Sequence, residues 1–101
     1  MAEWIKVTEE SSFTGSCSVN CNGRPVALFK LEDGIYAIDD TCSHEYAKLS
    51  EGEVVDDEVF CPKHGSRFNI KNGAVLGLPA LKPVKSYPVR VENGEVYIQW
   101  S

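Results

Sequence analysis

The sequence lacks long apolar runs, an excess of basic residues and an export signal. Its apolar stretches are only a few residues long, as at residues 26–29, and none approaches the ~20 residues that a membrane-spanning helix needs. The 101 residues carry a net charge of −5, which disfavours nucleic acid and anionic membranes as partners. Residues 1–4 show no basic region followed by an apolar stretch, so we expect a cytoplasmic protein.

Cysteine and histidine are scarce, and their placement is informative. Four cysteines in 101 residues are too few for a disulfide scaffold, and in a reducing compartment they are better explained as metal ligands or buried thiols. Only two histidines occur, His44 and His64, and each follows closely behind a cysteine. The length suits one globular domain, so we expect residues 1–101 to form a single domain.

The pattern of the chain predicts an all-β fold. No helical apolar period persists for three turns, whereas short β-rich runs recur at intervals of about ten residues. Four dipeptides that tolerate positive φ mark tight hairpin turns: Asn22-Gly23, Asp33-Gly34, Asn72-Gly73 and Asn93-Gly94. The runs predict strands at residues 4–8, 16–20, 26–31, 35–39, 53–55, 58–61, 67–70, 86–92 and 95–100.

Two stretches do not have the pattern of regular strands. Residues 41–52 contain the first cysteine and histidine pair, with a helical turn expected near residues 45–49. Residues 77–83 contain Pro79 and Pro83, which are incompatible with a central strand. We expect both stretches to be loops on the β scaffold, where functional residues usually lie.

Two cysteine–histidine boxes carry the chemistry. Cys42-Ser43-His44 is a CxH pair and Cys61-Pro62-Lys63-His64 is a CxxH pair, with sixteen residues between His44 and Cys61. Two loops of this kind can present two thiolates and two imidazoles to one metal site. A structural zinc ion accepts such a set, but its usual spacing does not mix the two ligand types within each pair, whereas a Rieske [2Fe-2S] centre requires that mixture.

The boxes resemble those of the Rieske family, whose second box commonly reads CPxHG, as in Cys61-Pro62-Lys63-His64-Gly65 here. The resemblance implies a Rieske-type antiparallel β-sandwich with two cluster-binding loops and a covering proline loop, and places the cluster-binding portion at about residues 41–83. It implies that Cys42 and Cys61 bind the inner iron of one [2Fe-2S] cluster, and that His44 and His64 bind the outer iron.

The resemblance also bears on the redox potential. High-potential members of the family have an extra cysteine in each box, which together form a disulfide, and a serine and a tyrosine that donate hydrogen bonds to the cluster region. Here the extra positions are Ala47 and Lys63, Ser66 matches the serine, and Phe68 stands in place of the tyrosine. We therefore expect a potential near the low end of the Rieske range, which runs from about −150 to +300 mV.

Missing features indicate a carrier and not an enzyme. A mononuclear iron oxygenase site needs two further histidines and a carboxylate, but both histidines here belong to the boxes. The chain also has no GxGxxG fingerprint for a nicotinamide or flavin cofactor. We therefore expect the chain to carry single electrons between partner proteins.

A carrier of this description is similar to the ferredoxin components of multicomponent aromatic-ring-hydroxylating dioxygenases. That resemblance implies a role in aromatic hydrocarbon catabolism, with a flavin-containing NAD(P)H ferredoxin reductase as the electron donor and a terminal Rieske oxygenase as the acceptor. A monomer suits such a carrier. Two alternatives stay open, namely the small Rieske-like subunit of a nitrite reductase and a zinc-stabilised binding module without a redox role.

Two further predictions concern residues outside the boxes. Cys17 and Cys21 precede the first box within or beside a predicted strand pair, so we expect buried thiols and not ligands. Acidic residues also cluster around the boxes, and we hypothesise that some of them steer basic patches on the partner proteins. These residues are Asp39, Asp40, Glu45, Glu51, Glu53, Asp56, Asp57 and Glu58.

Overall fold

The structure is a computed structural model that describes residues 3–42, 47–63, 65–78 and 82–100. Its regular elements are strands and two short 3-10 turns, η1 (Glu10–Ser12) and η2 (Leu49–Glu51), and no α-helix occurs in these ranges. This confirms the predicted all-β class. The strands are β1 (Glu3–Glu9), β2 (Ser16–Cys21), β3 (Arg24–Leu31), β4 (Gly34–Asp39), β5 (Glu53–Val55), β6 (Glu58–Phe60), β7 (Arg67–Asn69), β8 (Val75–Gly77), β9 (Ser86–Tyr87), β10 (Val89–Glu92) and β11 (Glu95–Trp100).

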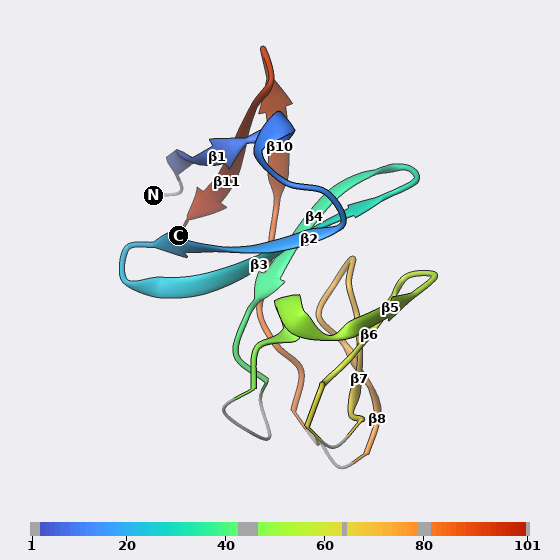
Figure 1. The fold of residues 1–101 in the computed structure, drawn as a ribbon. Coiled ribbons are helices and arrows are strands. Elements are labelled where there is room, and N and C mark those ends of the chain that lie inside the picture. Colours follow the sequence, from blue (N-terminus) through green and yellow to red (C-terminus); the bar gives the residue numbers. More distant parts are fainter. Residues whose placement is uncertain (1–2, 43–46, 64, 79–81, 101) are drawn as a thin grey trace.

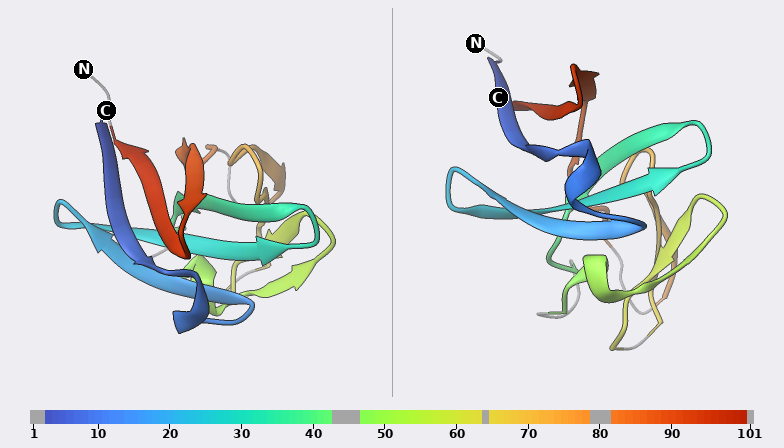
Figure 2. Two further views of the ribbon diagram at one scale, coloured as in Figure 1. Left: turned by 90° about the horizontal axis from the view of Figure 1, so that it is seen from above. Right: turned by 45° about the horizontal axis from the view of Figure 1, so that its top comes forward.

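Three antiparallel sheets form the fold. Strands β1-β11-β10 make one sheet, β2-β3-β4-β9 a second, and β5-β6-β7-β8 a third. The second sheet lies between the other two, with the terminal sheet on one side and the β5–β8 sheet on the other (Figures 1 and 2). The first and last strands pair with each other, so β1 and β11 close the terminal sheet from opposite ends of the sequence.

Strand β3 shows why the middle sheet holds the molecule together. Its residues Val26, Ala27, Leu28 and Phe29 are all buried, although alternate side chains of a strand point to opposite faces. Val26 and Leu28 belong to a core shared with the terminal sheet, whereas Ala27 and Phe29 belong to a core shared with the β5–β8 sheet. A strand buried on both faces needs an unbroken apolar run, and residues 26–29 supply it.

Two of the predicted turns have the expected geometry. Asn22-Gly23 joins β2 to β3 and Asn93-Gly94 joins β10 to β11, and all four residues have positive φ, as a type I′ turn requires. The turn near Asp33 also exists, but Gly34 is already the first residue of β4. Asn72-Gly73 lies in a longer connection between β7 and β8 and does not form a two-residue hairpin turn.

Three sequence predictions need correction. The expected strand at residues 86–92 is broken at Pro88, which has no N–H for a ladder bond, and its two halves pair with different strands, β9 with β4 and β10 with β11. Strand β8 was not predicted. The helical turn expected near residues 45–49 falls partly outside the described residues, and the 3-10 turn begins only at Leu49.

Within the described ranges, no helix is long and apolar enough to cross a membrane.

Candidate metal centre

The first box follows the end of β4, and the backbone segments on its two sides, residues 41–42 and 47–48, are paired with each other. The backbone N–H of Cys42 donates to the carbonyl of Ala47 at 3.0 Å, and Thr41 forms an isolated antiparallel bridge with Lys48. Cys42 is buried, with only 3% of its surface exposed. The other predicted ligand of this box, His44, lies outside the described residues.

The second box occupies the turn between β6 and β7. The backbone N–H of Cys61 donates to the carbonyl of Ser66 at 2.7 Å, and that of Gly65 donates back to Cys61 at 3.0 Å. Gly65 has φ of +75°, a left-handed conformation that glycine adopts without strain. Cys61 is buried as well, at 2% exposure. His64 lies outside the described residues.

The two loops are built alike. In each, a buried cysteine starts the loop, and its N–H closes the loop on the carbonyl five residues later. Cys42 and Cys61 also belong to the same hydrophobic cluster, which lies between the middle sheet and the β5–β8 sheet. The structure therefore brings the two predicted thiolate ligands, which eighteen residues separate in the sequence, into one hydrophobic cluster.

The donor chemistry of these loops fits an iron–sulfur cluster. Two thiols at the bases of matched loops, together with the histidine that each box has in the sequence, would supply two sulfur and two nitrogen donors. All four cysteines of the chain are thiols and none forms a disulfide. Among the described residues, which hold only two of the four predicted ligands, no three Cys, His, Asp or Glu side chains converge on one point.

The structure describes three of the positions at which the sequence differs from or matches high-potential Rieske proteins, namely Ala47, Ser66 and Phe68. Ser66 and Phe68 are both fully buried, and Phe68 packs in the same cluster as the two cysteines. Ala47 packs against this cluster from the first loop. Because a phenylalanine has no hydroxyl, the position that carries a donor in high-potential relatives has only an apolar ring here.

Asp39 ends β4 and anchors the chain at Lys85 and Tyr87, where it enters β9. Its carboxylate accepts two hydrogen bonds from Arg24, at 3.0 and 2.8 Å, and one from the Tyr87 hydroxyl at 2.6 Å. Its backbone N–H donates to the carbonyl of Lys85 at 2.9 Å. Burial raises the pKa of Asp39, but the hydrogen bonds from Arg24 and Tyr87 outweigh it and leave that pKa below its ordinary value.

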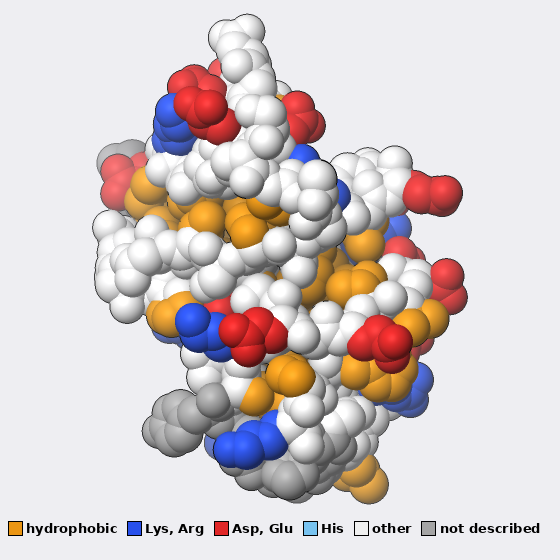
Figure 3. Space-filling view, in the orientation of Figure 1, with side chains coloured by type: hydrophobic (Ala, Val, Ile, Leu, Met, Phe, Trp, Pro, Cys, Tyr) orange, Lys and Arg blue, Asp and Glu red, His pale blue; other side chains and the backbone are white. Residues whose placement is uncertain are grey.

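The acidic run does not form one surface, which corrects part of the steering hypothesis. Asp39 is nearly buried and Asp40 is fully buried, so neither can meet a partner. Glu58 pairs with Arg67 at 2.9 Å, and Glu45 lies outside the described residues. Acidic side chains appear at several separate places on the face drawn in Figure 3. The exposed members of the run are Glu51, Glu53, Asp56 and Asp57.

Cys17 and Cys21 occupy β2, away from the boxes in the sequence and in a different core. Cys21 is buried and Cys17 packs against the core between the middle and terminal sheets. Burial raises the pKa of both thiols, which keeps them protonated and disfavours metal binding. Cys21 is a buried thiol, as the sequence predicts, whereas Cys17 is only partly buried, which corrects that prediction for Cys17.

Sequence analysis missed the polar residues that hold the first loop in place. Asp40 accepts hydrogen bonds from the Ser18 hydroxyl at 2.7 Å and from the Ser50 N–H at 2.8 Å. In the sequence Asp40 belongs to an acidic run, and that pattern predicts a surface acid. The available signal was its position directly after a strand end and two residues before the first cysteine.

The model of the Rieske [2Fe-2S] domain family matches residues 3–88 of this chain. That match spans most of the sequence and both boxes, so the chain belongs to the Rieske [2Fe-2S] domain family. The resemblance inferred from the two boxes is confirmed, and membership implies a [2Fe-2S] cluster.

Curated relatives give the class of Rieske protein. The 3-phenylpropionate/cinnamic acid dioxygenase ferredoxin subunit of Escherichia coli K12 is 47% identical over 74 residues, covering 72% of this chain and 70% of the relative. The anthranilate 1,2-dioxygenase ferredoxin subunit of Burkholderia cepacia is 36% identical over 100 residues, covering 97% and 93%. These relatives are electron-transfer components of dioxygenase systems and not the catalytic oxygenases themselves.

Solved structures agree with this class. A chain from the complex of reduced oxygenase and oxidized ferredoxin in carbazole 1,9a-dioxygenase matches with a TM-score of 0.84 and 38% identity, covering 94% of this chain and 91% of that chain. A protein described as the small subunit of an NADPH nitrite reductase matches with a TM-score of 0.83 at 27% identity, covering 95% and 97%.

Proposed function

We propose that this chain is a Rieske ferredoxin, a one-electron carrier of an aromatic-ring dioxygenase system. In this proposal residues 1–101 form one domain, and Cys42, His44, Cys61 and His64 hold one [2Fe-2S] cluster within the portion 41–83. The observation that carries the proposal is the pair of matched loops, each starting from a buried cysteine of the same apolar cluster. The full-length likeness to dioxygenase ferredoxin subunits supports it.

When bound, a [2Fe-2S] centre held by two thiolates and two imidazoles supplies one-electron chemistry at a potential between about −150 and +300 mV. One residue near the second box bears on where in that range the potential lies. Phe68 is fully buried and has no hydroxyl, so its position cannot donate a hydrogen bond that would favour the reduced state. We therefore propose a potential near the low end of the range.

We propose two partners, a flavin-containing ferredoxin reductase and a terminal Rieske oxygenase. The solved complex between an oxygenase and a ferredoxin supports the second, since the ferredoxin-like chain in that complex shares this fold. A carrier that binds and leaves two proteins in turn needs a small interface, which suits a monomer in the cytoplasm. Of the four exposed members of the acidic run, Asp57 pairs with Lys71, and Glu51, Glu53 and Asp56 are the candidates for steering the encounter.

The small subunit of a nitrite reductase is a second candidate, favoured by one structural match of high TM-score. The intact set of two cysteines and two histidines favours the carrier, because such subunits often depart from that set. Stopped-flow mixing discriminates the two. A diffusing ferredoxin, reduced by dithionite, is reoxidised by a terminal oxygenase at a rate that saturates with oxygenase concentration, whereas a fixed subunit copurifies with a nitrite reductase and shows no such reaction.

The ligand assignment is tested by low-temperature EPR of the dithionite-reduced protein and of single variants. We expect the wild type to show a rhombic signal with a low average g, as mixed thiolate and imidazole ligation gives. Cys42→Ser and Cys61→Ser should abolish that signal. Cys21→Ser is the matched control, because Cys21 is equally buried but lies in the other core, and it should keep the signal. Loss of the signal in Cys21→Ser alone would overturn the assignment.

A further inference from the structure

Asp40 is a fully buried carboxylate at the entrance of the first loop. Its Oδ2 accepts a hydrogen bond from the Ser18 hydroxyl at 2.7 Å, and its Oδ1 accepts one from the Ser50 backbone N–H at 2.8 Å. Its relative exposure is 0%. Both side-chain oxygens therefore act as hydrogen-bond acceptors.

The same residue ties the two sides of the loop together through its backbone. The carbonyl of Asp40 accepts a hydrogen bond from the N–H of Leu49 at 2.7 Å. Further along the loop, the Cys42 N–H donates to the Ala47 carbonyl at 3.0 Å. Residues 40–42 and 47–49 thus form a short antiparallel ladder, which starts at Asp40 and ends at Cys42, the first predicted thiolate ligand. A shift of Asp40 would therefore also shift the backbone position of Cys42.

Asp40 differs from the carboxylate beside it. Asp39 is paired with the Arg24 guanidinium, whereas no lysine or arginine of the described ranges forms an ion pair with Asp40. A buried carboxylate held only by neutral donors is costly, because its desolvation is not offset by an opposite charge. An apolar residue would leave the Ser18 hydroxyl and the Ser50 N–H without their acceptor, so the carboxylate ties the end of β4 both to β2 and to the returning chain at Ser50.

We propose that Asp40 is a positioning residue for the cluster, which fixes the first loop and holds a negative charge next to the site. This rests on the proposed function. Asp40 lies two residues before Cys42, so their α-carbons are no more than about 7 Å apart. A fixed negative charge at that range disfavours addition of an electron to the site, and it acts in the same direction as the missing hydroxyl at Phe68.

The magnitude follows from Coulomb's law. At an effective dielectric constant of about 20, two unit charges whose separation is on the order of 10 Å change an equilibrium constant by about one order of magnitude. For a one-electron couple, tenfold corresponds to about 59 mV. Asp40→Asn keeps the shape of the side chain and removes the charge, so we expect its midpoint potential to rise by about that amount.

The test measures the potential by anaerobic redox titration and the cluster geometry by EPR, on the holoprotein. The matched control is Glu51→Gln, which neutralises an exposed carboxylate at the other side of the same loop. Solvent screens an exposed charge, so this variant should keep the wild-type potential. An Asp40→Asn protein with full cluster content and the wild-type potential would overturn the electrostatic part.

Ser18→Ala tests the positioning part if Asp40→Asn does not fold. It leaves the loop and its charge intact and removes one of the two donors to Asp40. We expect iron release to a chelator to become several times faster, with g values shifted from those of the wild type. Release and g values equal to those of the wild type would overturn the positioning role. A wild-type protein without iron and sulfide would instead overturn the proposed function, so the two failures are distinguishable.

Discussion

Replacing Asp39 by alanine should destabilise the fold where the chain at Lys85 and Tyr87 meets the end of β4. The substitution leaves the Tyr87 hydroxyl without its acceptor, and Tyr87 is only 4% exposed, so this costs about 1–3 kcal/mol. Arg24 also loses its partner, but its side chain is 52% exposed and water can replace the carboxylate, so this adds about 0.5–1 kcal/mol. The expected total is about 1.5–4 kcal/mol.

Anaerobic thermal unfolding of the holoprotein at one scan rate measures the effect. In a domain of this size each kcal/mol lowers Tm by about 4–8 °C, so Asp39→Ala should unfold about 6–32 °C below the wild type. The double variant with Tyr87→Phe removes the stranded hydroxyl. Its loss should therefore be about 1–2 kcal/mol smaller than the sum of the two single losses. Additive losses would refute the reasoning, because they would mean that Asp39 and Tyr87 are not coupled.

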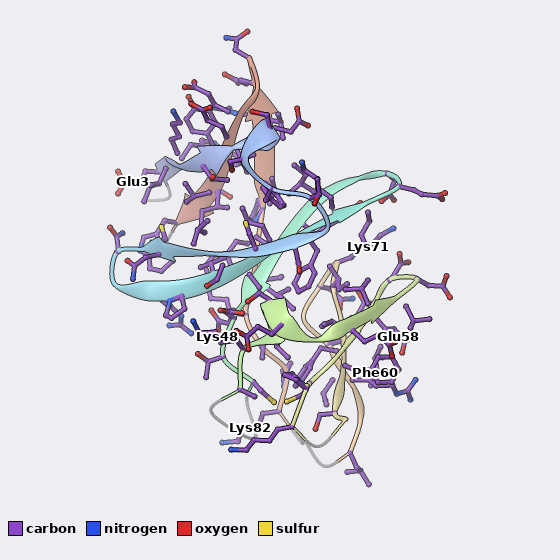
Figure 4. All side chains as sticks on the ribbon, in the orientation of Figure 1. Glu3, Lys48, Glu58, Phe60, Lys71 and Lys82 are labelled. Carbon is purple, nitrogen blue, oxygen red and sulfur yellow. The ribbon has the colours of Figure 1, made fainter. Side chains whose placement is uncertain are left out.

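Three further outcomes are expected. The first concerns pH, because the pKa of Asp39 is lower in the folded state than in the unfolded state. The stability that this carboxylate contributes is therefore complete above its unfolded pKa of about 3.9 and is lost as pH falls below that value. The difference in Tm between the wild type and Asp39→Asn should shrink at that low pH. Gly73→Ala should cost at least about 2 kcal/mol in urea unfolding, because the added carbon strains a backbone with φ of +77° and overlaps a carbonyl oxygen. Gly23→Ala, with φ of +83° and open space around it, should cost clearly less; equal costs would exclude the overlap. Glu53→Lys should slow association with the terminal oxygenase at low salt. Glu3→Lys is the control, because Glu3 lies at the end of the molecule opposite Lys82 in Figure 4, and it should leave the rate unchanged. Equal association rates for the two variants would show that Glu53 does not steer the encounter.

Local patterns predicted the hairpins better than the sheets. Asn22-Gly23 and Asn93-Gly94 specify their turns because the required positive φ is a property of those residues alone. The pairing of β1 with β11 depends on contacts between chain ends, which a local pattern does not contain. Strand β8 was missed because three residues beside a proline-containing loop give too short a signal.

The site was predicted in part, for a similar reason. The spacing of Cys42 and Cys61 within their boxes is visible in the sequence, because ligand geometry restricts residue type and separation. The supporting acids are different. Asp39 and Asp40 have the composition of a solvated run, and only the packing of β2, β3 and β9 around the end of β4 shows that both are buried.

The central claim is that this chain holds a [2Fe-2S] cluster, and elemental analysis of anaerobically purified protein tests it most directly. The account predicts two irons and two acid-labile sulfides per chain, with no stoichiometric zinc. One zinc per chain and no sulfide would contradict it, because a single zinc ion held by the same two boxes gives the chain no electron to carry.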